Sequence, residues 1–313
     1  MEYRKLIKFG NSSFIISIPG KWLKRNKLSK GDVVYLEEDG ESRLILYSNF
    51  EKEKKESEAL IDTKNKNIGR VVEEIYRAYT DGFDVIKLIG DDINLISENI
   101  RKVMNNFVAV EIIEQTGNKI IAKNFLNIKD VKIKDVIRRI DIILRSMLRD
   151  SIECIGENKC DGIVQRDVDI NRLCFMLERI LKTAMNDPEI SRKIDIRGIE
   201  LLHVWYIVMN LESIGDEVKR ISRFLDIIDL NTKQMKEIKI IYENIEKSYL
   251  DVMKAYYKSD KKLAFDVSNR KNELHEQCNK FFEKNQILRV GGMIEKMKAM
   301  VSWIKTISLV SYE

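Results

Sequence analysis

Residues 211–222 read LESIGDEVKRIS and combine a helical apolar pattern with two acidic side chains. Glu212 and Asp216 are four residues apart, which places both carboxylates on one face of a helix. The same face continues upstream with three apolar residues, Leu201, Trp205 and Met209. We expect this face to lie against a neighbouring helix, where two like charges need a cation or a metal ion to neutralise them.

A second segment of the chain, QRDVDINRL, offers Asp167 and Asn171 at the same spacing. If the two segments form adjacent helices, both pairs meet, and carboxylate clusters on bundle helices bind metal ions. The alternative is structural, because Asp216 can pair with Lys219 and Arg220 on its own helix. The spacing alone leaves both interpretations open.

From Lys132 onward the chain consists of long amphipathic segments, which predict helices. They cover residues 132–156, 161–186, 196–227, 232–258, 260–285 and 293–312. Asn186-Asp187-Pro188 and Gly291-Gly292 predict two of the breaks between them. Six helices with short connections pack antiparallel, and six divide naturally into two three-helix bundles, residues 130–229 and 231–313. A weak internal repeat supports this division, since SMLRDSIECI and SYLDVMKAYY each place an aspartate in a first-helix apolar stripe.

The start of the chain differs in composition from the rest. Residues 1–30 hold eight Lys and Arg against Glu2 alone, so 8 − 1 gives +7, and the formal net charge of +5 leaves −2 for the remainder. Strands are predicted at 3–9 and 13–18, a short helix at 21–28, and two further strands joined by a turn at 38–41. A module of 48 residues is too small for a stable core, so we expect it to need a partner chain. Its positive charge is typical of a DNA-binding surface, although a solvated face would have it too.

The middle of the chain has a third character. Residues 49–67 are highly charged and predict a linker or a solvated helix. Residues 68–126 predict a small α+β element. Its parts are a helix at 68–81, a strand at 83–89, a helix at 93–106 and a hairpin at 109–124 closing at 116–118. Its role is open between a spacer, a dimer contact and an anion site.

Several classes of function are poorly supported by the residues present. The four cysteines, Cys154, Cys160, Cys174 and Cys278, form no C-x-x-C pair, so we expect buried free thiols. The chain has two histidines and no phosphate loop, dinucleotide fingerprint or nucleophile elbow, and we therefore expect no enzyme. No apolar run approaches the ~20 residues of a membrane span, which predicts no membrane insertion and a cytoplasmic protein.

The N-terminal run RKLIKFGNSSFIISIPGKWLKRNKLSKGDVVYLEEDG resembles the AbrB/SpoVT/MazE family of swapped-hairpin DNA-binding domains. The resemblance implies that two chains exchange hairpins into one barrel-like dimer with a basic face toward DNA. It implies DNA contacts first for Arg4, Lys5 and Lys8, and then for Ser12, Ser13 and Lys21.

Residues 130–313 resemble the PhoU family of phosphate-uptake regulators, chiefly through LESIGDEVKRIS. The resemblance implies two paired three-helix bundles. It also implies a bound metal ion, divalent or ferric, with iron or zinc as the candidates. It assigns Asp167, Glu212 and Asp216 as ligands with Asn171 as a weaker one. Asn171 stands where the family usually has an aspartate, and the final helix IEKMKAMVSWIKTISLV lacks the second acidic pair, so at most one cluster is expected.

Together these observations predict a mostly α protein with a small β N-terminal domain, an α+β element and two PhoU-like bundles, in the order of the PhoU-type regulators of archaea. The expected function is a homodimeric, phosphate-responsive transcriptional regulator that binds DNA through residues 1–48. The alternative is a PhoU-type accessory protein that restrains a phosphate transporter or sensor kinase, with the N-terminal domain only dimerising.

Overall fold

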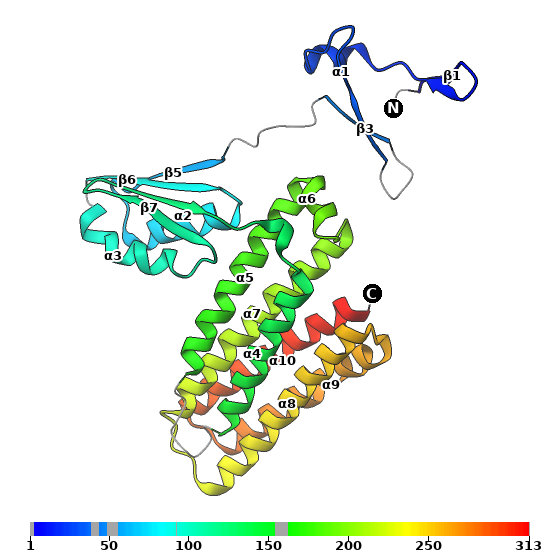
Figure 1. Ribbon diagram of the computed structural model, residues 1–313. Coiled ribbons are helices and arrows are strands. Elements are labelled where there is room, and N and C mark those ends of the chain that lie inside the picture. The colour runs from blue at the N-terminus through cyan, green and yellow to red at the C-terminus, as the bar shows by residue number, and fades with distance from the viewer. Residues whose placement is uncertain (1–2, 39–43, 49–55, 92, 154–161, 313) are drawn as a thin grey trace. The chain divides into compact units, whose positions relative to one another are not determined.

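The computed structural model describes residues 3–38, 44–48, 56–91, 93–153 and 162–312. The chain forms two compact units, residues 1–56 and 57–313 (Figure 1). The fold is mostly α with a small N-terminal β region, as the sequence predicts. Each unit is described by itself below.

The first unit contains two antiparallel hairpins and one short helix. Strands β1 (Ile7–Phe9) and β2 (Ser13–Ile15) form the first hairpin, with Ile7 opposite Ile15. Helix α1 (Gly20–Arg25) follows, and β3 (Tyr35–Glu38) pairs with β4 (Leu44–Tyr47). The predicted order of elements is confirmed, although β1 and β2 are shorter than the alternation suggests. Most of the predicted turn at 38–41 lies outside the described residues.

None of the described residues of this unit is buried. Among its described residues, eleven large hydrophobic side chains are exposed: Tyr3, Leu6, Ile7, Phe9, Phe14, Ile15, Ile16, Val33, Tyr35, Leu36 and Leu44. So much exposed apolar surface on so short a segment marks an interaction surface, because a monomer of this size cannot cover it. The partner chain that the sequence predicts would supply the missing cover, and the swapped-hairpin dimer stays a prediction.

The second unit begins with a four-stranded sheet covered by two helices. The strands are β5 (Glu58–Asp62), β6 (Val85–Ile89), β7 (Val110–Gln115) and β8 (Lys119–Asn124), in the spatial order β5-β6-β8-β7. The pair β5–β6 is parallel and the others are antiparallel. Helices α2 (Ile68–Thr80) and α3 (Ile93–Met104) lie on one face of this sheet and share its apolar core (Figure 1).

Part of the predicted linker is wrong. Residues 58–62 are not a linker or helix but strand β5, an edge strand of the sheet. The sequence EALID alternates between exposed and buried positions, and Ile61 is only 4% exposed. The alternation is short and lies between charged segments, so the sequence pattern does not stand out. The segment forms a strand because it pairs with β6 in parallel. Residues 49–55 of the expected linker lie outside the described part of the chain.

The six predicted helices of the C-terminal half are confirmed. They are α4 (Ile133–Glu153), α5 (Ile163–Asn186), α7 (Ile199–Leu225), α8 (Thr232–Lys258), α9 (Lys261–Lys284) and α10 (Leu288–Tyr312). A seventh, α6 (Pro188–Lys193), starts at the predicted break, where the Asp187 side chain accepts a hydrogen bond from the backbone of Glu189. Pro188 at the first helical position explains why the chain restarts a helix here.

The predicted break at Gly291-Gly292 is wrong, because both residues lie inside α10. A Cβ atom on Gly292 would lie 2.7 Å from a ring carbon of Phe224, and one on Gly291 would lie 3.0 Å from the ring of Phe282. The two glycines therefore let α10 approach two aromatic rings, one on α7 and one on α9. This close packing offsets the helix propensity lost at each glycine, about 1 kcal/mol.

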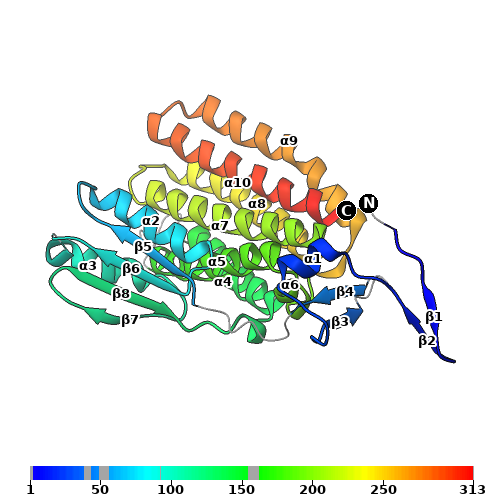
Figure 2. The ribbon, with the colours of Figure 1, turned by 90° about the horizontal axis from the view of Figure 1, so that it is seen from above.

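The six long helices share one continuous apolar core. Helices α4, α5 and α7 form one group and α8, α9 and α10 the other. The contacts between α7 and α10 and between α4 and α8 join the two groups (Figure 2). The internal repeat reappears as matching ion pairs, since Asp150 of α4 binds Arg166 of α5 and Asp251 of α8 binds Arg270 of α9. Among the described helices, none has a stretch long and apolar enough to cross a membrane.

Arg179 of α5 joins the α+β element to the helices. Its guanidinium donates hydrogen bonds to the carbonyl oxygens of Tyr79 at 2.7 Å, Phe83 at 2.8 Å and Gly82 at 3.2 Å. The same group lies 5.3 Å from the centre of the Tyr79 ring. Because the side chain is only 2% exposed, these bonds are shielded from water and hold the C-terminal end of α2 on α5.

Candidate functional site

Acidic side chains of α5 and α7 meet where these two helices pack. The Lys219 ammonium lies between them and donates hydrogen bonds to Asp167 Oδ2 and Asp216 Oδ1, each at 2.6 Å. The Asn171 amide nitrogen lies 3.4 Å from Asp167 Oδ2. The two helices thus bring the predicted residues together, and a lysine supplies the cation between them.

The electrostatics of this acidic cluster follow from its burial. Burial, together with the charges of Asp216 and Asp167, raises the pKa of Glu212 to about 7. Burial also raises the pKa of Asp167, while the hydrogen bond from Lys219 opposes that rise. Burial acts to lower the pKa of Lys219, but its bonds to Asp167 and Asp216 leave that pKa raised. The lysine is therefore held charged, and the least compensated member of the cluster is Glu212.

The structural alternative for Asp216 is confirmed, because it pairs with both basic residues on its own helix. Its second oxygen accepts from Arg220 at 2.8 Å. The same arginine binds Glu217 at 2.8 Å, and Glu217 Oε2 lies 3.9 Å from the ammonium of Lys296 on α10. Sequence reasoning missed Glu217, which is 6% exposed. The sequence could have indicated Glu217, because it directly follows Asp216 and therefore points from a neighbouring face of the same helix.

Two features decide how far these residues fit a metal ion. Asp167 Oδ1 and Asn171 Oδ1 are buried and have no hydrogen-bond partner, so oxygen donors are present. Oxygen donors alone suit hard cations better than zinc. Within the part of the chain that the structure describes, however, no three His, Cys, Asp or Glu side chains are arranged to hold a metal ion. With Lys219 in place the residues do not fit a metal site, and metal binding stays a prediction.

The apolar face predicted upstream on α7 is only partly buried. Leu201 is buried, whereas Trp205 and Met209 are half-buried. The fully buried stripe of α7 runs instead through Ile207, Leu211, Ile214, Val218 and Ile221. The acidic pair lies beside this stripe, where Asp216 reaches both Lys219 and the partly exposed Arg220.

All six residues predicted to contact DNA are exposed: Arg4, Lys5, Lys8, Ser12, Ser13 and Lys21. The first hairpin gathers some of them, because Ser13 lies opposite Phe9, the neighbour of Lys8. Arg4 and Lys5 precede β1, and Lys21 belongs to α1. The structure therefore groups Lys8, Ser12 and Ser13 on one hairpin, places Arg4 and Lys5 just before it, and carries Lys21 on a separate element.

The thiols within the described residues are inert. Cys174 and Cys278 are free and buried, as predicted. Burial raises the pKa of Cys174 well above its ordinary value and raises that of Cys278 to about 12. A thiol with so high a pKa carries almost no thiolate at neutral pH and makes a poor nucleophile. Cys154 and Cys160 lie outside the described residues.

Comparisons with known proteins agree with the predicted order of domains. Residues 137–225 match the family model of the PhoU domain, which covers α4 to α7. Residues 7–58 match the family model described as antidote-toxin recognition MazE, bacterial antitoxin. No curated protein and no solved structure matches the chain. The chain thus contains, in this order, a segment that matches the MazE model and a segment that matches the PhoU-domain model, as the sequence predicts.

Proposed function

We propose that the protein is a phosphate-responsive transcriptional regulator that binds DNA through its N-terminal unit. The observation that carries this proposal is the union in one chain of a MazE-type segment and a PhoU-domain segment. Their combination supports a phosphate-related regulator whose first domain is of a DNA-binding type.

The surface of the first unit supports DNA binding as a dimer. Its exposed apolar residues need a partner, and a second copy of the same unit would cover them. Its basic residues remain exposed on the β1–β2 hairpin and on α1. Two copies would double the number of positive charges that face DNA. Each DNA phosphate that they neutralise releases counterions, so binding weakens steeply as the salt concentration rises.

Fluorescence anisotropy with DNA fragments upstream of the protein's own gene and of phosphate-transport genes tests the proposal. We expect specific binding that falls with salt and shifts when phosphate is added. The double variant Arg4→Ala/Lys8→Ala should lose most of the affinity. The matched control Lys233→Ala/Lys236→Ala removes two exposed charges from α8 and should bind as the parent does. Unchanged affinity of the first variant at low salt would overturn the DNA role.

A second candidate function follows from the PhoU-domain segment, which lies entirely within the second unit. In that case the helices dock on a phosphate transporter or sensor kinase, and the first unit only dimerises. The Arg4→Ala/Lys8→Ala variant would then still bind the transporter or kinase. Pull-downs would recover membrane-associated proteins with this variant and with the Lys233→Ala/Lys236→Ala control alike. Salt-sensitive, sequence-specific DNA binding favours the first candidate.

A further inference from the structure

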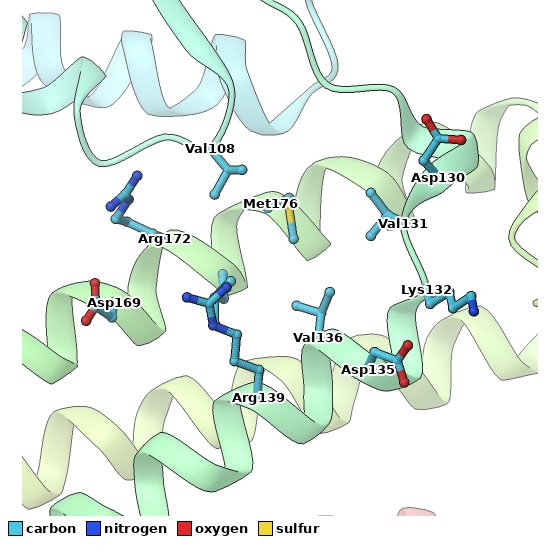
Figure 3. Close-up of a pocket in the computed structure, with 11 residues that line it drawn as sticks. Val108, Asp130, Val131, Lys132, Asp135, Val136, Arg139, Asp169, Arg172 and Met176 are labelled. Atoms are coloured by element: carbon cyan, nitrogen blue, oxygen red, sulfur yellow. The ribbon is translucent and has the colours of Figure 1, made fainter.

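A pocket of about 550 Å³ lies where the α+β element meets helices α4 and α5 (Figure 3). Its walls come from the loop before β7, from the short 3-10 helix η1 (Ile128–Asp130) and from the facing sides of the two helices. Pockets of 300–1,000 Å³ accommodate small molecules of drug or nucleotide size. The sequence alone did not reveal this pocket.

Two arginines define one end of the pocket. Arg139 of α4 and Arg172 of α5 both line it, and Figure 3 shows their guanidinium groups at the same end. Among the described residues neither arginine forms an ion pair, and Arg172 Nε is buried without a hydrogen-bond acceptor. Asp169 also lines this end of the pocket, but no ion pair joins it to either arginine among the described residues, and the Arg172 Nε donor stays unsatisfied. An anion bound between the two guanidinium groups would accept from that donor and offset their positive charge.

The rest of the lining determines what kind of anion fits. The middle of the pocket is apolar, formed by side chains that include Val108, Val136 and Met176. The end away from the arginines carries the carboxylates of Asp130 and Asp135 and the ammonium of Lys132 (Figure 3). A matching ligand has an anionic head, an apolar body and polar groups, both donors and acceptors, at its far end. A nucleoside phosphate combines all three features.

The pocket lies beside the contact that Arg179 makes. Arg172, Met176 and Arg179 are spaced at three and four residues along α5, so they lie on one face of that helix. Met176 and Arg172 line the pocket, while Arg179 binds the backbone at the end of α2. A ligand in the pocket therefore contacts both the α+β element and the helices.

We infer that this pocket binds a phosphorylated small molecule of nucleotide size, with its phosphate between Arg139 and Arg172. Such binding goes beyond the proposed function and does not require DNA.

Isothermal titration calorimetry on the full-length protein tests the inference, with AMP, inorganic phosphate and adenosine as probes. We expect AMP to bind and adenosine to bind at least about tenfold more weakly, because adenosine lacks the phosphate that would accept charge-assisted hydrogen bonds from the arginines. Inorganic phosphate should bind more weakly than AMP, since it leaves the apolar walls uncovered. If phosphate alone binds as tightly as AMP, the nucleotide-sized ligand is wrong.

Variants locate the site. Arg139→Gln and Arg172→Gln should each weaken AMP binding about tenfold or more, whereas Lys134→Gln, an exposed charge on α4 outside the pocket, should not. Arg139 is exposed, so its variant is expected to fold, and circular dichroism verifies both proteins. The inference is overturned if neither AMP nor phosphate binds, or if both arginine variants bind AMP as the parent does. If the parent protein binds AMP but does not bind DNA specifically, the proposed function alone is overturned.

Discussion

Lys219 of α7 and Asp167 of α5 form an ion pair of 2.6 Å at the centre of the acidic cluster. The same ammonium bonds Asp216 on its own helix at the same distance. Asp167 is 3% exposed, so its charge depends on this partner rather than on water. One lysine thereby bridges carboxylates of two helices and holds α5 against α7.

Replacement of this lysine tests its structural role. Lys219→Met should lower the free energy of unfolding by roughly 2–4 kcal/mol at pH 7, because it leaves buried carboxylates without a partner. Urea unfolding in the presence of EDTA measures the change. The double variant Lys219→Met/Asp167→Asn should recover part of the loss. A single-variant effect below about 0.5 kcal/mol would show that solvent, not Lys219, screens the cluster.

The same substitution tests the predicted metal site. With the ammonium removed, Asp167 Oδ2 and Asp216 Oδ1 lose their cation and join the unpartnered Asp167 Oδ1 and Asn171 Oδ1, while Asp216 Oδ2 still accepts from Arg220. We expect Lys219→Met to bind Mn²⁺ at least about tenfold more tightly than the parent, and Lys219→Met/Asp167→Asn to lose that gain. Calorimetric titration with Mn²⁺ and Zn²⁺ measures both. Equal affinity in the parent and Lys219→Met would show that the lysine does not compete with metal.

Glu212 predicts a pH dependence of stability. Its pKa in the folded protein is about 7 against an ordinary value of 4.5, so the folded state binds the proton more tightly than the unfolded state does. Stability therefore falls as pH rises between these values. Glu212→Gln should exceed the parent in stability by a margin that grows from pH 5 to pH 8, to on the order of 1–2 kcal/mol after allowance for partial exposure. Urea midpoints at the two pH values measure it, and Glu243→Gln, exposed on α8, should show no such trend.

Arg179 predicts how firmly the α+β element is attached. Arg179→Met removes three hydrogen bonds to backbone carbonyls and should destabilise their surroundings by about 3 kcal/mol. Amide hydrogen exchange should accelerate at the C-terminal end of α2 and in β6. The control Lys182→Met removes a partly exposed pair with Asp81 and should cost less than about 1 kcal/mol. Equal exchange rates in both variants would mean that apolar packing alone holds the element.

Gly292 offers a test of close helix packing. Alanine favours a helix over glycine by about 1 kcal/mol, but its Cβ atom would lie 2.7 Å from the Phe224 ring. Gly292→Ala should therefore lower stability by roughly 1–3 kcal/mol. Adding Phe224→Leu should make room for the methyl group and restore part of the loss. A stabilised Gly292→Ala protein would contradict the packing found here.

Helical periodicity located every long helix, because burial of one face requires apolar residues at intervals of three and four. The spacing of Glu212 and Asp216 likewise predicted a carboxylate face turned toward α5. For Lys219 the same reasoning found the bond within its own helix and missed the bond to Asp167. The reason is that an interhelical contact depends on the register of two helices, which neither sequence segment contains.

The sequence by itself determined the elements that rest on local patterns: the long helices, the α+β element and a basic N-terminal module too small to form a core. Only the tertiary structure decided the features that depend on distant partners. It turned part of a charged linker into strand β5, placed Gly291 and Gly292 inside a helix, and brought Arg139 and Arg172 to one pocket. Local patterns are encoded by neighbouring residues, whereas pairing, close approach and shared cavities arise only when segments far apart in the chain pack together.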